Sequence, residues 1–300
     1  MDAIRRRLRR QNPRTILNQP LWLPFSGAIE LLLEKSRSHL KKEEPYKLDI
    51  TLLPILIVFF SGLVAGVINT LAGGGSLLTL PILLFVGLPA PIANGTNRVA
   101  IWIQCVAAVV SFQKRGIPCA RPGIRLSLPA IVGAILGAQW SLQIPEDAFR
   151  KILAVIMLIV IGLVVWNPNP KPIGSYSPSM VRKIFTALVF FLIGLYGGFL
   201  QVGVGFMFTA VLTLLCGFDL VTTAGVKVFV IAVYTLFALL VFLYHGQVDW
   251  SVALVLSLGN GIGGWIGGRI AVEKGETWLR VILAVSVVAM AFKLLGVFPF

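Results

Sequence analysis

Charged residues are scarce in this sequence. Asp, Glu, Lys and Arg together make up 13% of its 300 residues, whereas soluble domains carry about a quarter. Two histidines and three cysteines are present, and Cys105, Cys119 and Cys216 lack the spacing of a disulfide framework or a metal site. Ser76 has no histidine near it in the sequence to activate it as a nucleophile. We therefore expect no enzyme, no metal and no cofactor.

Carboxylates are also missing from the interior of the apolar segments. Outside the N-terminal tail, the acidic residues lie near predicted segment ends: Asp49, Glu146, Asp147, Asp219, Asp249, Glu273 and Glu276. Proton and sodium relays in membranes commonly use buried carboxylates. The sequence therefore offers no obvious group for coupling transport to a cation.

Long apolar runs fill most of the chain, with 57% hydrophobic residues and a mean hydropathy of +0.89. Apolar segments are predicted at about 50–70, 77–88, 95–112, 124–143 and 150–166, and then at about 184–202, 206–217, 224–244, 250–268 and 278–298. Since a membrane-spanning helix needs about 20 apolar residues, this pattern predicts an all-α, multi-pass protein of the cell (inner or plasma) membrane.

The two sets of five segments form a tandem repeat. A shift of 132 carries Gly62, Gly66 and Gly73 onto Gly194, Gly198 and Gly205, and a shift of 130 carries Gly87, Gly95 and Gly116 onto Gly217, Gly225 and Gly246. So many matches under one nearly constant shift indicate duplication, which is common in secondary transporters. The predicted regions are a tail at 1–47, repeat 1 at 48–166, a loop at 167–183 and repeat 2 at 184–300.

The net charge is +14, and basic residues are concentrated in the tail. Eleven of the 26 basic residues precede residue 48: Arg5, Arg6, Arg7, Arg9, Arg10, Arg14, Lys35, Arg37, Lys41, Lys42 and Lys47. We interpret the tail as an interfacial amphipathic helix attracted to anionic lipid headgroups, not to nucleic acid. A targeting presequence is the rival interpretation.

The number of crossings depends on the two short segments, 77–88 and 206–217. If each continues its predecessor as one broken crossing, there are eight crossings, and the basic loops share the side of the tail, as the positive-inside rule favours. If each crosses alone, there are ten, and the repeats are inverted. Both short segments are predicted to be half-helices or re-entrant pieces after a break.

Cations and hydrogen-bonding groups cluster around these breaks. Gly73, Gly74 and Gly75 interrupt the first half, and each half carries a cation just after its short segment, Arg98 or Lys227. Free backbone N–H groups and helix N-termini favour anions. The sequence therefore predicts a small-anion site at Asn69, Gly73, Gly74, Gly75, Ser76, Asn94, Thr96, Asn97, Arg98, Gln201, Gly203, Gly205, Thr223 and Lys227.

Each of these signals has a simpler explanation. The glycines serve tight helix packing in many membrane proteins, and Asn69 could be only an interhelical hydrogen-bond partner. Arg98 and Lys227 lie a few residues into their segments, from where long cationic side chains can reach the headgroups.

The first-half run AGVINTLAGGGS at 65–76, with Pro81 and then ANGTNRVA at 93–100, resembles the sulfite exporter TauE/SafE family of membrane permeases. The second-half run GLYGG at 194–198, with Gly203, Gly205 and AGVK at 224–227, resembles that family's second repeat. The resemblance covers about residues 50–298. It implies a permease for sulfite, sulfoacetate or related sulfonates and carboxylates, working outward.

Two features depart from the family pattern. The basic tail lies outside the family core, and the second half has Phe206, Met207 and Phe208 where the first has Gly74, Gly75 and Ser76, with Thr213 in place of Pro81. The two half-sites are therefore unequal. A passive anion channel and a permease for another small anion remain alternatives, since rings of Arg or Lys also select anions in pores. The sequence leaves a homodimer open.

Overall fold

The computed structural model describes residues 52–149, 151–153, 155 and 180–294, and it describes side chains up to Lys274. The predicted tail at 1–47 lies outside this part of the chain, as does most of the predicted loop at 167–183. Residues 180–183 of that loop already belong to the next helix.

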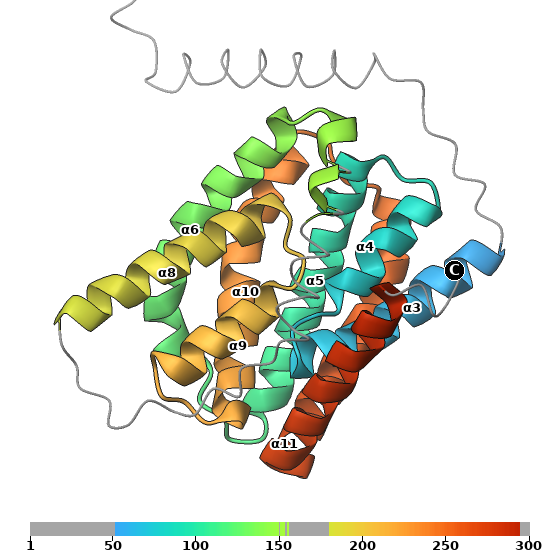
Figure 1. Cartoon of the computed structure of the whole chain (residues 1–300). Coiled ribbons are helices and arrows are strands. Elements are labelled where there is room, and N and C mark those ends of the chain that lie inside the picture. The colour runs from blue at the N-terminus through green and yellow to red at the C-terminus, as the bar shows by residue number, and fades with distance from the viewer. Residues whose placement is uncertain (1–51, 150, 154, 156–179, 295–300) are drawn as a thin grey trace, which may run out of the picture. The chain divides into compact units, whose positions relative to one another are not determined.

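The described residues are helical throughout, apart from short connections (Figure 1). Their helices are α3 (Leu52–Leu71), α4 (Ser76–Phe85), α5 (Ala90–Gln113), α6 (Ala120–Gln143), α8 (Met180–Phe199), α9 (Val204–Leu214), α10 (Leu220–Tyr244) and α11 (Trp250–Leu294). Six of these helices are long and apolar enough to cross a membrane, whereas α4 and α9 are shorter apolar helices. The predicted all-α, multi-pass membrane protein is thus confirmed, while the count of eight to ten crossings stays a prediction.

The C-terminal helix differs from the prediction of two segments at 250–268 and 278–298. A single helix, α11, runs over Trp250–Leu294 and crosses the predicted boundary. The stretch between the two predicted segments contains a glycine and charged residues, and neither type of residue prevents a helix from continuing.

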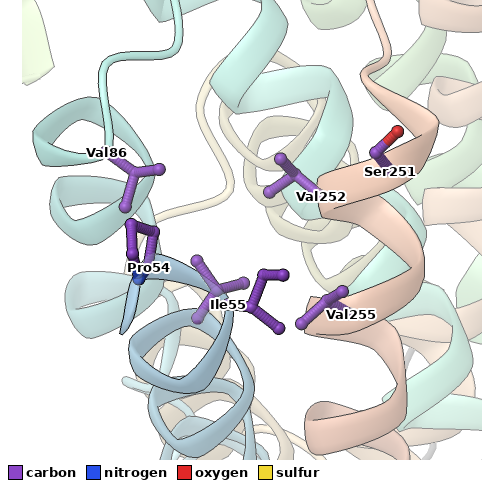
Figure 2. A pocket seen from close by; sticks show the side chains of 7 residues that line it. Pro54, Ile55, Val86, Ser251, Val252 and Val255 are labelled. Atoms are coloured by element: carbon purple, nitrogen blue, oxygen red, sulfur yellow. The ribbon is translucent and has the colours of Figure 1, made fainter. Parts of the chain in front are cut away.

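The chain reverses after each predicted break. Val86, which follows α4, lies beside Pro54 and Ile55 at the start of α3, and with α11 they line an apolar pocket of about 160 Å³ (Figure 2). In the second half, Arg182 near the start of α8 donates to the carbonyls of Leu214 and Leu215 at the end of α9. Each short helix therefore turns back along its predecessor, unlike the straight broken crossing on which the count of eight rests.

Corresponding long helices of the two halves run in opposite directions. Thr96, near the start of α5, accepts a hydrogen bond of 2.9 Å from the backbone N–H of Asp249, which follows α10. At the other end, a side chain on Gly225, near the start of α10, would meet Cys119 and Ile117, which follow α5. The start of each helix lies beside the end of the other, so α5 and α10 are antiparallel.

The outer helices pack across the two halves through glycines. Gly259 and Gly263 of α11 lie against the backbone of Phe59 and Leu63 in α3, where a Cβ atom would overlap the carbonyl oxygens. Gly133 and Gly137 of α6 make the same approach to α8. Helix backbones this close gain van der Waals contact, which drives helix association in lipid. These glycines of α6 and α11 thus serve helix packing.

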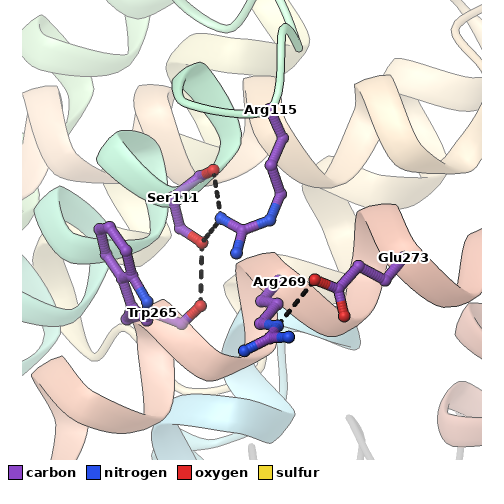
Figure 3. A network of polar contacts seen from close by, with 5 residues as sticks. All are labelled: Ser111, Arg115, Trp265, Arg269 and Glu273. Carbon is purple, nitrogen blue, oxygen red and sulfur yellow. Dashed lines mark hydrogen bonds and ion pairs between the residues drawn. The ribbon is translucent and has the colours of Figure 1, made fainter.

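A polar network also joins α5 to α11 (Figure 3). Ser111 donates to the carbonyl of Trp265 at 2.9 Å, and Arg115 donates to the carbonyl and the hydroxyl oxygen of Ser111. Lys114 and Arg115 lie over the Trp265 ring, at 5.1 and 5.9 Å from its centroid. This end of α5 is therefore held by a cationic contact that complements its C-terminal dipole.

Two glycines of α11 test the packing of α3 against α11. We expect Gly263→Ala to lower the midpoint of thermal unfolding in detergent, because its Cβ would overlap the Leu63 carbonyl and two further backbone atoms. Overpacking of this kind costs about 1–3 kcal/mol. Gly261→Ala is the control, since its Cβ would meet only the Ile103 side chain. An equal loss of stability in both variants would contradict this account of the interface.

Candidate functional site

The two helix breaks, distant in the sequence, lie against each other in the core. A Cβ atom on Gly73 would overlap the backbone of Gly205, and the reverse holds as well. The Ser76 hydroxyl donates to the Gln201 carbonyl at 3.0 Å and accepts from the Gly203 N–H at 3.4 Å. Predicted site residues of both halves therefore meet at one point.

The backbone of each break needs glycine. Gly73 has φ +98° and Gly203 has φ +69°, in the left-handed region that side chains disfavour. These two glycines are related by a shift of 130, whereas the sequence comparison had paired Gly73 with Gly205. Gln201 has φ +61° without being a glycine, and such a conformation costs about 1–2 kcal/mol. Its surroundings must hold it in place.

Arg98 reaches the C-terminal end of the helix before the second break. Its side chain has no exposed surface. Nη1 donates to the Gly197 carbonyl at 3.0 Å and to Gln201 Oε1 at 3.2 Å, and Nη2 donates to the Gly198 carbonyl and Asn94 Oδ1. The guanidinium carbon lies 4.5 Å from the centroid of the Phe242 ring. Arg98 therefore caps α8 in the core and does not extend to the headgroups.

Lys227 makes the equivalent contact with the first half. It is also fully buried, and its Nζ donates to the carbonyl of Leu71, the last residue of α3, at 3.3 Å. Each cation thus serves the broken helix of the opposite half. Neither forms a salt bridge with a carboxylate in the part of the chain that the structure describes.

The two cations lie at different depths. At a rise of 1.5 Å per residue, Arg98 is about 12 Å from the start of α5 at Ala90, and Lys227 is about 10 Å from the start of α10 at Leu220. Because α5 and α10 are antiparallel, the two charges are displaced toward opposite ends of the pair. The breaks lie between them.

Asn69 and Gln201, the two amides before the breaks, have different partners. Asn69 Nδ2 donates to Gln104 Oε1 at 2.6 Å, and Gln104 Nε2 donates to Thr70 at 2.8 Å. Gln201 instead accepts from Arg98 and donates to Thr235 at 2.7 Å. Only the second amide therefore contacts a cation.

The other predicted polar residues form contacts between helices. Asn94 donates to Ser141 at 3.1 Å and to the Phe199 carbonyl at 2.9 Å. Asn97 accepts from Thr79 at 2.7 Å, and Thr223 lies 3.5 Å from the Thr213 hydroxyl. The Thr96 hydroxyl accepts a hydrogen bond from the backbone N–H of Asp249, as described above. Contact of these residues with a substrate stays a prediction.

Four residues of this region were absent from the prediction: Gln104, Tyr234, Thr235 and Phe242. The shift of 130 relates Gln104 to Tyr234, and this match between two polar residues in apolar segments was the available signal. Phe242 gave no signal, because a phenylalanine in an apolar helix looks like any other core residue.

The cysteines near the helix ends do not form a reactive site. Burial raises the pKa of the Cys119 and Cys216 thiols to about 11, so both are protonated at neutral pH and poor nucleophiles. Among the residues that the structure describes, no group of three His, Cys, Asp or Glu side chains lies close enough to hold a metal ion.

Residues 58–294 match the profile of a family described as Sulfite exporter TauE/SafE. A probable membrane transporter protein, ORF9, of Sinorhizobium sp is 28% identical over 248 residues, which cover 83% of this chain and 95% of that protein. The probable membrane transporter protein YfcA of Escherichia coli K12 is 27% identical over 239 residues, or 80% of this chain and 88% of that protein. No solved structure matches the chain.

Ser76 tests the contact between the breaks. We expect Ser76→Ala to destabilise the folded protein in detergent, because the Gln201 carbonyl and the Gly203 N–H would lose their shared partner. Buried unsatisfied groups cost about 1–3 kcal/mol.

Ser127→Ala is the matched control for this measurement. Ser127 is equally buried, but its hydroxyl bonds only to the Gly123 carbonyl of its own helix, at 2.8 Å. Its removal should change the unfolding midpoint little. If the two serine variants unfold at the same temperature, the Ser76 bridge contributes nothing to the contact.

Proposed function

The chain belongs to the sulfite exporter TauE/SafE family of membrane transporters, and we propose that it carries a small sulfur oxyanion or organosulfonate outward by alternating access. The observation that carries this proposal is the pair of buried cations, Arg98 and Lys227, beside two helix breaks that touch each other.

The charge balance at the breaks supports an anionic substrate. Each break places one helix C-terminus and one helix N-terminus together, and their partial charges, about half a unit each, largely offset one another. The two side-chain charges then remain without a carboxylate counterion among the described residues. Because a buried charge is costly unless it is paired, a small anion with one or two negative charges would complete the site.

The helix directions support alternating access. In an inverted repeat, corresponding helices of the two halves run in opposite directions, and α5 and α10 do so. We infer that the halves are inverted repeats. Each repeat begins with a helical hairpin, α3–α4 or α8–α9, whose chain turns back at the break. In transporters of this type, one half rocks against the other around a site near the bilayer midplane.

The substrate class rests on the family. The relatives carry names that specify no substrate beyond membrane transport, so the sulfur oxyanion follows from the family description alone. Arg98 and Lys227 would attract the anion, and the backbone of Gly73, Gly74 and Gly75 would offer N–H groups to it.

Proteoliposomes containing the purified protein provide the direct test. We would measure uptake of labelled sulfite, sulfate, thiosulfate and short sulfonates, with and without an imposed pH gradient. Saturable flux of a sulfur anion supports the proposal. Single-channel currents would instead identify a passive channel. If only a different small anion crosses, the proposed substrate is wrong and that anion takes its place.

The two cations should each be needed for this flux. We expect Arg98→Gln and Lys227→Gln to lower the initial rate at low substrate concentration by about tenfold or more, since a hydrogen bond to a charged group contributes about 1.5–3 kcal/mol.

Lys183→Gln serves as the control for the loss of one positive charge, because Lys183 lies exposed on α8, away from the breaks. Arg98→Lys keeps the charge if Arg98→Gln fails to fold. Normal flux through folded protein that lacks both central cations would remove the basis of the proposal.

A further inference from the structure

We propose that the anion binds on one side of the paired breaks, to the Tyr234 hydroxyl and the Arg98 Nε–H, and that the corresponding groups of the first half are not available to it. This inference rests on the proposed anion transport and adds the atoms that hold the substrate.

The first observation concerns buried polar side-chain atoms that lack a hydrogen-bond partner. Among the residues that the structure describes, four buried side-chain atoms have no partner: Arg98 Nε, Tyr234 Oη, Ser257 Oγ and Asn260 Oδ1. Two of the four belong to residues at the second break, and both of these residues are fully buried. Nearly all buried polar groups in proteins have hydrogen-bond partners, so two neighbouring groups without one need an explanation.

The two groups lie close together. A Cβ atom built on Gly197 would be 2.8 Å from Tyr234 Oη, and the carbonyl of the same Gly197 accepts from Arg98 Nη1 at 3.0 Å. Both orphaned groups can donate, Arg98 as a cation and Tyr234 as a phenol. Together they match an acceptor that carries negative charge.

The equivalent position in the first half is already satisfied. Gln104 corresponds to Tyr234 under the shift of 130, but its amide accepts from Asn69 and donates to Thr70. In the second half, Gln201 donates to Thr235 and accepts from Arg98. The Tyr234 hydroxyl lies near both Gln201 and Thr235, but it forms no hydrogen bond of normal geometry with either. The two halves therefore differ at this position, since the Gln104 amide is paired and the Tyr234 hydroxyl is not.

The surroundings favour a small oxyanion. The Tyr234 ring lies 5.9 Å from the Phe208 ring, and Arg98 lies over Phe242, so apolar surface encloses the donors on two sides. The four terminal N–H groups of Arg98 already have protein acceptors, so its Nε–H remains as one charge-assisted donor for an oxyanion oxygen. Sulfite and sulfonate both present such oxygens.

Tyr234→Phe is the decisive variant, because it removes only the hydroxyl. Deleting an unpartnered buried hydroxyl should leave the thermal midpoint of the anion-free protein unchanged or raised. The concentration of sulfite or methanesulfonate that stabilises the protein half-maximally should rise about tenfold or more. Tyr244→Phe, at an exposed position, should change neither quantity.

The outcomes separate this inference from the proposed function. If the unmodified protein is stabilised by the anions and Tyr234→Phe responds to the same concentrations, the inference is wrong and the function stands. If Tyr234→Phe lowers the midpoint without anion, the hydroxyl has a structural partner, and the inference is also wrong. If none of the anions stabilises or crosses with the unmodified protein, the proposed function itself fails.

Discussion

The backbone carbonyls at a helix end inside a membrane must find hydrogen-bond donors, because lipid offers none. In this protein two helices, α3 and α8, end within the core, and each receives a cation from the opposite half. Arg98 and Lys227 donate hydrogen bonds to the carbonyls at these helix ends, as water does at exposed helix ends in soluble proteins. Without them, the breaks that distinguish this chain from a plain helical bundle would be too costly to keep.

Under the proposed function, the same two residues would link stability to substrate recognition. A carbonyl carries only a partial charge, so it satisfies the hydrogen bonds of a cation better than it neutralises the charge. Arg98 uses both of its terminal nitrogens on protein acceptors and keeps Nε without one. Under the proposed function, the site retains both charge and a free donor after the fold is complete, and an anion would supply what the protein lacks.

The sequence predicted the apolar helices, the two breaks and the position of the cations, because each leaves a local mark: length, glycine or charge. It left open whether α4 and α9 continue the preceding helix or turn back as re-entrant pieces, since no residue marks the direction in which a chain leaves a glycine. It also divided α11, because local composition does not show whether a helix stops at a glycine and charged residues or continues past them. Tyr234 was missed because a tyrosine in a membrane helix is ordinary unless its hydroxyl is seen to lack a partner.

The direct contact between Gly73 and Gly205 leaves no room for a side chain at either position. A movement of one hairpin toward the other is blocked by backbone, which cannot change rotamer as a side chain can. In the proposed alternating-access cycle, the two hairpins would therefore form an interlock, because neither could move toward the other unless the other moved with it. Such an interlock would prevent both membrane faces from opening together and so limit leakage of ions, with no separate gate for the purpose.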